Sequence, residues 1–117
     1  MSKLKFFRPS TAGIPEFAAP APDRVLEGNP QFSTWPLSEI GGVSTGIWGA
    51  TPGSHRVERD GSLLEQFYLL EGEMELIEDG LPAQRFTAGD LVVIEPNFRG
   101  IWKTITPVKK VYFTNSL

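Results

Sequence analysis

Hydrophobic and polar residues alternate in short runs from residue 32 onward. Within 65–70, Glu65, Phe67 and Leu69 share one face, and residues 91–94 are apolar throughout. A period of two over four to eight residues predicts β-strands, and a continuous short apolar run is typical of a central strand. The predicted strands are 32–37, 43–51, 54–60, 65–70, 73–78, 83–87, 91–94, 100–106 and 109–114.

Residues that favour turns separate these runs. The turn signals are Gly41-Gly42, Pro52-Gly53, Asp60-Gly61, Asp79-Gly80, Gly89-Asp90 and Pro96-Asn97. The Asp79-Gly80 pair predicts a hairpin with a type I′ turn, in which both central residues have positive φ. No segment of ten or more residues has helical periodicity, so the pattern predicts an all-β fold, either a small barrel or a sandwich.

Residues 1–30 differ from the rest because they hold five of the ten prolines. Proline disfavours helix, so this segment is expected to be extended or irregular. Two interpretations stand: a disordered tail, or an arm that lies across the barrel or a partner subunit. Its apolar side chains favour the arm. They are Leu4, Phe6, Phe7, Ile14 and Phe17. The expected organisation is an arm over 1–30 and a single domain over 31–117.

Composition narrows the function classes. The 117 residues suffice for one core, and 14 acidic against 11 basic residues give a net charge of −3, which argues against a nucleic-acid or acidic-membrane partner. The absence of cysteine excludes disulfides and thiolate metal sites and fits a cytoplasmic protein. No run approaches the roughly 20 apolar residues of a membrane helix.

A series of landmarks in the strand region resembles the cupin superfamily. The landmarks are Gly46-Ile47-Trp48, Thr51-Pro52-Gly53, Glu65 with 68–72, Asp79-Gly80, Ala88-Gly89-Asp90, Gly100 with Trp102, and 107–112. They cover about residues 46–112 and are similar to the single-domain group that includes ureidoglycine aminohydrolase cupin domains and the ethanolamine-utilisation cupin. The resemblance implies a small antiparallel cupin barrel (an RmlC-like jelly roll or double-stranded β-helix) with an extended N-terminal arm.

The histidines of metal-binding cupins are missing from this sequence. That resemblance implies two histidines shortly before Glu65 and a third beyond the second glycine turn, but Glu58 and Asp60 (or Arg59 and Gly61) occupy the first two positions. The third falls at or near Gly100, and the chain's one histidine, His55, comes too early. We therefore expect no metal and no cofactor. Asn97 replaces the glycine of the second turn and is expected to adopt the left-handed conformation.

Glu65 is the candidate catalytic residue. Its position in the alternation along 65–70 points its carboxylate into the barrel, where an unpaired charge is costly. Glu65 would therefore donate or accept a proton or anchor a ligand. The alternative is a structural ion pair with Arg56, Lys103 or Lys110. An all-oxygen metal site of Glu58, Asp60 and Glu65 is disfavoured, because the first two belong to an exposed charged hairpin.

Aromatic and basic side chains supply the candidate binding residues. They are Arg56, Tyr68, Trp102, Lys110 and Tyr112, with Trp48 more typical of core. The alternative is that the aromatic residues form the core and a subunit interface. A Glu65–Lys110 pair would favour binding or positioning over acid–base chemistry. His55 is expected to pack or to contact a ligand, and its titration keeps proton transfer open.

Three functional hypotheses follow. The first is a metal-independent cupin that binds or turns over a small polar metabolite. The second, implied by the resemblance, is a metal-dependent aminohydrolase of a ureido amino acid, against which the missing histidines argue. The third is a non-catalytic scaffold. Whether the protein is an enzyme stays open. A homodimer through an edge strand and the arm is expected, because edge pairing would remove an exposed sheet edge.

Overall fold

The computed structural model describes residues 2–117, so only the first residue of the expected arm, Met1, lies outside the described residues. These residues form strands and two short 3-10 helices. In chain order the elements are η1 (Pro9–Thr11), β1 (Glu16–Ala18), η2 (Pro22–Arg24), β2 (Val25–Gly28), β3 (Phe32–Ile40), β4 (Val43–Ala50), β5 (Gly53–Glu58), β6 (Leu63–Glu71), β7 (Glu73–Glu78), β8 (Gln84–Thr87), β9 (Leu91–Ile94), β10 (Arg99–Thr104) and β11 (Val108–Ser116). No helix in residues 2–117 is long and apolar enough to cross a bilayer.

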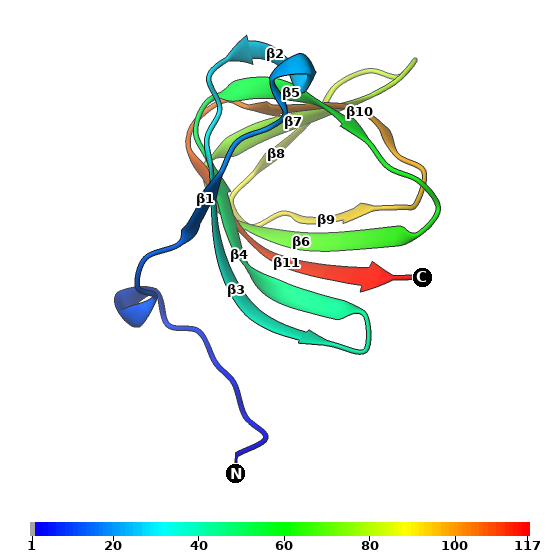
Figure 1. Ribbon diagram of the computed structural model, residues 1–117. Helices are drawn as coiled ribbons and strands as arrows, with labels where there is room; N and C mark the ends of the chain where they lie inside the picture. Colours follow the sequence, from blue (N-terminus) through cyan, green and yellow to red (C-terminus); the bar gives the residue numbers. More distant parts are fainter. Residues whose placement is uncertain (1) are drawn as a thin grey trace.

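Two antiparallel sheets face each other (Figure 1). The larger sheet has the order β1-β3-β4-β11-β6-β9, and the smaller one has the order β2-β5-β10-β7-β8. The nine strands predicted from the alternation correspond to β3–β11, with differences of a few residues at their ends. The all-β expectation is confirmed. The strands splay apart at the end of the molecule where β6 begins and β11 ends (Figure 1).

The segment between residues 16 and 28 contributes one strand to each sheet. β1 pairs with β3 at the edge of the larger sheet, and β2 pairs with β5 at the edge of the smaller one. Before β1 the chain runs along the outside of the larger sheet, where the Trp35 indole donates a hydrogen bond to the carbonyl of Gly13 (3.1 Å). Further toward the N-terminus, Phe6 and Phe7 lie beside Trp35, Pro36 and Leu37 of β3.

The core lies between the two sheets and follows the alternation of the strands. Phe67 and Leu69 on β6 and Met74 on β7 have no exposed surface. Further buried side chains around them come from both sheets: Ala50, Leu76, Val92, Ile94, Trp102 and Val108. Glu65 shares the inward face of β6 with Phe67 and Leu69, as the sequence predicted.

Backbone conformation explains three turn residues. Gly72 has φ +87°, and a Cβ atom there would lie 2.1 Å from the carbonyl oxygen of Pro107, so only glycine fits. Asn97 has φ 71°, which confirms its expected left-handed conformation. The predicted type I′ turn at Asp79-Gly80 is wrong: a turn closes there from Leu81 N–H to the Glu78 carbonyl, but only Gly80 has positive φ.

Candidate functional site

A cavity of about 280 Å³ lies between the sheets, near the open end. Aromatic, hydroxyl and charged side chains line it together. They are Phe32, Thr34, Trp48, His55, Val57, Arg59, Glu65, Trp102, Lys110, Tyr112 and Thr114. Every lining residue comes from β3, β4, β5, β6, β10 or β11, or follows β5 directly, so rigid strands position the site.

Three charged side chains meet inside this cavity. Glu65 lies near the start of β6 opposite Thr114, whereas Lys110 lies opposite Leu69 on the same pair of strands. Four residues of strand correspond to about 13 Å, so the two side chains reach toward each other along the cavity. Arg59 enters from the other sheet just after β5, where its backbone N–H donates to the carbonyl of Phe98 (2.9 Å).

Both oxygens of the Glu65 carboxylate contact a cation. Lys110 Nζ donates to Oε2 at 2.5 Å, and Arg59 Nη1 lies 2.6 Å from Oε1. Glu65 is 4% exposed and Lys110 is 5% exposed, so this pair is shielded from water. A buried ion pair is tolerated only when geometry and further contacts offset the loss of hydration.

Aromatic rings supply those further contacts to Lys110. Its ammonium lies 4.5 Å from the ring centre of Trp48, 4.6 Å from that of Phe67 and 4.4 Å from that of Trp102. Cation–π attraction is strongest where water is excluded. Lys110 is therefore enclosed by three ring faces and one carboxylate.

The two cations, Lys110 and Arg59, keep Glu65 ionised. Burial alone would raise the pKa of Glu65, but the charges of Lys110 and Arg59 hold it below its ordinary value. Burial lowers the pKa of Lys110, and the neighbouring Glu65 opposes this. A carboxylate with a lowered pKa is a poor proton donor and a weak base at neutral pH, so the arrangement suits binding better than acid–base catalysis.

His55 forms part of the opposite wall. Its ring packs edge-on against Phe32 and stacks near Trp102, with ring centres 5.1 Å and 6.4 Å away. Burial, then the charges of Lys110 and Arg59, lower the pKa of His55 to about 4, so the imidazole is neutral at physiological pH. Nδ1 of this ring is buried and has no hydrogen-bond partner within residues 2–117.

Trp102 and Tyr112 complete the walls. Trp102 is 2% exposed, and its indole N–H donates to the hydroxyl of Thr104 (3.2 Å). Tyr112 is half-buried, and burial raises the pKa of its phenol. A Cβ atom at Gly46 would lie 2.7 Å from the Tyr112 hydroxyl oxygen and 2.5 Å from the Trp35 carbonyl oxygen, so the glycine makes room for the phenol.

The structure brings together four of the six residues predicted from the sequence. Glu65, Trp102, Lys110 and Tyr112 line the cavity. The other two are Arg56 and Tyr68, and neither lines it. Arg56 points to the other face of β5, where its guanidinium makes a bidentate pair with Asp79, and Tyr68 is 43% exposed on the outside of β6.

Sequence reasoning missed two features of the lining, Arg59 and the unpartnered atom of His55. In the sequence, Arg59 stands out only as the occupant of a missing histidine position. The available signal was the alternation of β5, since His55, Val57 and Arg59 are two residues apart and therefore lie on one face.

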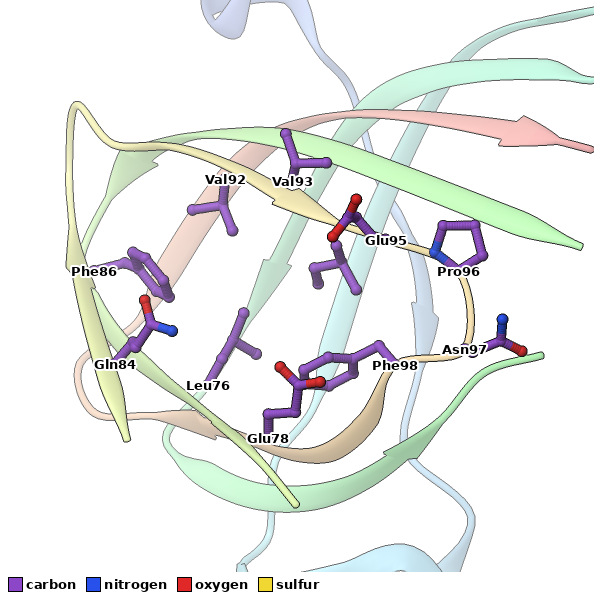
Figure 2. A pocket seen from close by; sticks show the side chains of 11 residues that line it. Leu76, Glu78, Gln84, Phe86, Val92, Val93, Glu95, Pro96, Asn97 and Phe98 are labelled. Atoms are coloured by element: carbon purple, nitrogen blue, oxygen red, sulfur yellow. The ribbon is translucent and has the colours of Figure 1, made fainter. Parts of the chain in front are cut away.

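A second hollow of about 230 Å³ lies beside β7, β8, β9 and the loop that leads to β10. Its lining mixes apolar and polar side chains, and Figure 2 shows Glu95 and Glu78 on opposite sides of it. Both glutamates are exposed, and neither makes an ion pair with another described residue. Because its acids are hydrated and unpaired, this hollow lacks the organised polar groups of the first cavity.

A family model for the EutQ-like cupin domain matches residues 37–112, which is more than half of the chain. The chain belongs to the EutQ-like cupin family. Comparison with curated proteins gives no match. The predicted cupin fold is thus confirmed, and the two facing sheets are those of the cupin jelly roll.

Solved structures agree with this fold. A protein of unknown function of the DUF861 family from Pseudomonas syringae pv. tomato has a TM-score of 0.75 and 23% identity, covering 86% of this chain and 43% of its own. Clostridium difficile EutQ has a TM-score of 0.66 and 16% identity, and the match covers 74% of this chain and 64% of that protein. A predicted oxalate decarboxylase from Thermotoga maritima has a TM-score of 0.71 and 15% identity, and the match covers 92% of this chain and 96% of that protein.

These identities are low, so the likeness concerns the fold alone. The cupin described here also spans less than two thirds of the Pseudomonas and Clostridium proteins. What the whole of either protein does therefore does not carry over to this chain.

The cavity of this cupin does not fit a divalent metal. Residues 2–117 contain no group of three or more histidine, cysteine, aspartate or glutamate side chains that could hold one. The cavity supplies Glu65 and His55, but both oxygens of Glu65 contact cations. A metal ion there would meet two positive charges and one occupied carboxylate.

Proposed function

We propose that this cupin binds a small polar metabolite in the cavity between its sheets and does so without a metal ion. The single observation that carries the proposal is the state of the polar atoms in the cavity. Both oxygens of Glu65 are paired with Lys110 and Arg59, whereas His55 Nδ1 is buried without a hydrogen-bond partner among the described residues. Buried polar atoms are normally satisfied, so unsatisfied ones that line a cavity support a ligand.

Metal analysis is the first test. Protein purified without chelator or affinity metal is expected to contain manganese, iron, nickel and zinc far below one equivalent by elemental analysis. Its melting temperature is expected to stay unchanged in excess EDTA, because Lys110 and Arg59 already neutralise Glu65. One equivalent of a single metal would contradict the proposal and would favour a metal-dependent aminohydrolase of a ureido amino acid.

Ligand binding is the second part of this test. In a thermal-shift screen of small polar metabolites, a true ligand at one hundred times its dissociation constant stabilises the native state by about 2.7 kcal/mol. Tyr112→Phe is expected to weaken that shift, and Tyr68→Phe is the matched control because its hydroxyl lies outside the cavity. A screen in which no compound stabilises the wild type would favour a scaffold protein instead.

A further inference from the structure

The cavity carries a surplus positive charge. Two cations, Arg59 and Lys110, line it against one acid, Glu65. His55 adds no charge at neutral pH because its pKa is lowered to about 4. Exposed Glu16 approaches Tyr112 at the rim, where water screens it. The enclosed part of the site is therefore complementary to a single negative charge.

Arg59 is the cation that remains available to a ligand. The ammonium of Lys110 is already enclosed by Glu65 and three rings. The side chain of Arg59 is 20% exposed, and within residues 2–117 its one ion pair is the contact of Nη1 with Glu65 Oε1. A guanidinium has five N–H donors in a planar fork that matches a carboxylate, so most of its donors are free.

A second polar contact lies further along the same face. His55 precedes Arg59 by four residues, which is about 13 Å of strand, and the arginine side chain covers part of that distance. The remaining wall between them is apolar or aromatic, formed by Val57, Trp102 and Phe32. The space suits a short planar or apolar body with one polar group at each end.

We propose that the ligand is a small organic monocarboxylate, whose carboxylate binds Arg59 and whose opposite polar group hydrogen-bonds to His55 Nδ1. This rests on the proposed function, because it assigns a chemical class to the metabolite of the same cavity. The cavity of about 280 Å³ limits the ligand to a small molecule. Arg59 thus selects the ligand by charge, while Glu65 and Lys110 hold the shape of the site.

Matched probe pairs test the charge preference. Benzoate and benzamide, and acetate and acetamide, have nearly the same shape within each pair but differ by one negative charge. Saturation-transfer NMR and calorimetry at neutral pH are expected to show that each carboxylate binds wild-type protein at least about tenfold more tightly than its amide. 4-Hydroxybenzoate is expected to bind more tightly than benzoate, and His55→Phe is expected to remove that advantage.

Arginine variants identify the selecting residue. Arg59→Gln is expected to bring carboxylate and amide to within about twofold of each other, and Arg59→Lys is expected to keep part of the preference. Arg56→Gln, on the outer face of β5, is the matched control and is expected to keep it all. Equal binding of amide and carboxylate by the wild type would overturn the monocarboxylate but leave metabolite binding intact. If none of these probes bound at about 10 mM, the monocarboxylate would be overturned, whereas metabolite binding itself is tested by the thermal-shift screen.

A different observation concerns the outer face of the larger sheet. Cross-strand pairing aligns Val111, Tyr68 and Leu91 in one row, and Phe113, Gln66 and Val93 in the next. Leu91 is 71% exposed and Val93 is 53% exposed, and both lie on β9, an edge strand of the larger sheet. A largely apolar face beside a free sheet edge is typical of an interaction site.

The part of the N-terminal arm that precedes β1 (residues 2–15, hereafter the arm) complements this face in charge and polarity. Its apolar side chains Leu4, Phe6 and Ile14 are more than two-thirds exposed. The arm has three basic residues and no acidic one, whereas residues 16–117 have eight basic and 14 acidic residues. Asp90 and Glu95 flank the strand that carries Leu91 and Val93. The arm already touches the far end of the same sheet beside Trp35.

We infer that the arm of a second copy of this chain covers the Tyr68–Leu91 face, so that the protein is a homodimer. Light scattering is expected to give about twice the 12.9 kDa chain mass at micromolar concentration. Leu91→Lys with Val93→Lys, and separately Leu4→Ser with Phe6→Ser, are expected to give monomers. Leu81→Lys is the matched control, because Leu81 is exposed in the β7–β8 turn.

Two results would overturn the dimer. A monomeric wild type would remove the second copy as the occupant of the face. Loss of the dimer in the β9 variant but not in the arm variant would show that the arm does not form the contact. High salt is expected to weaken the dimer, since a basic arm on an acidic body is attracted through water.

Discussion

Glu65→Gln is expected to lower the free energy of unfolding by about 3–5 kcal/mol, as is typical when one partner of a buried ion pair is removed. The glutamine keeps the size of the side chain but leaves the Lys110 ammonium buried without its counter-charge. Arg59 loses its ion-pair contact at the same time. Urea denaturation at pH 7, followed by tryptophan fluorescence, measures the change.

Glu58→Gln is the matched control for this variant. Glu58, at the end of β5, undergoes the same chemical change, but its side chain is 40% exposed, and surface pairs contribute at most about 1 kcal/mol. Combining Glu65→Leu with Lys110→Met is expected to restore much of the lost stability, because an apolar replacement of a buried pair is often neutral. If Glu65→Gln cost no more than Glu58→Gln, the enclosed pair described above would be wrong.

Acidification from pH 6.5 to pH 4.5 is expected to destabilise the protein by about 1–2 kcal/mol through His55 alone. In the unfolded chain His55 has its ordinary pKa of 6.5, and in the folded protein its pKa is lowered to about 4. Between these values the unfolded state binds a proton that the folded state does not, so lowering the pH favours unfolding. The stability is complete above pH 6.5 and is lost toward pH 4.

Urea titrations across this range measure the slope, and His55→Phe is expected to flatten it while keeping the ring against Phe32. Glu65 does not add to this slope. Because its pKa is lowered in the folded protein, its contribution to stability is lost only when the pH falls below the pKa of glutamate in the unfolded chain. His55 is the one histidine in the chain, so its imidazole NMR signals report its titration directly. A midpoint near 6.5 in the folded protein, or an unchanged slope in His55→Phe, would contradict the environment described for this ring.

The strands and the inward face of β6 could be predicted from the sequence because alternation is a local property. Parity alone assigns Glu65, Phe67 and Leu69 to one face, and the same parity places Tyr68 on the other. The placement of Arg56 could not be fixed in this way, because the charged run from Arg56 to Asp60 does not reveal which of its faces is turned inward. The only sign of the inward face was Val57, an apolar residue that lies between His55 and Arg59 on the same face of the strand.

The partners of Glu65 required tertiary information. Lys110 was one of three candidate cations, and the sequence does not distinguish them because all lie more than five residues from Glu65. Pairing of β11 with β6 brings Lys110 within reach, whereas Lys103 lies beside Glu27 and Arg56 beside Asp79. Strand order and register decide such contacts, and both depend on long-range packing.

The position of Lys110 on a central strand also selects the native alignment of β11 during folding. Lys109 lies on the outer face beside Trp35, and Lys110 lies on the inner face beside Trp48. A slip of β11 by one residue would turn the Lys110 side chain out into water and leave the Glu65 carboxylate without its ammonium in an apolar interior. Misaligned pairings of β11 with β6 are thereby penalised by the same charge that the correct alignment satisfies. This buried pair therefore discriminates between competing folded states even where its net contribution to stability is small.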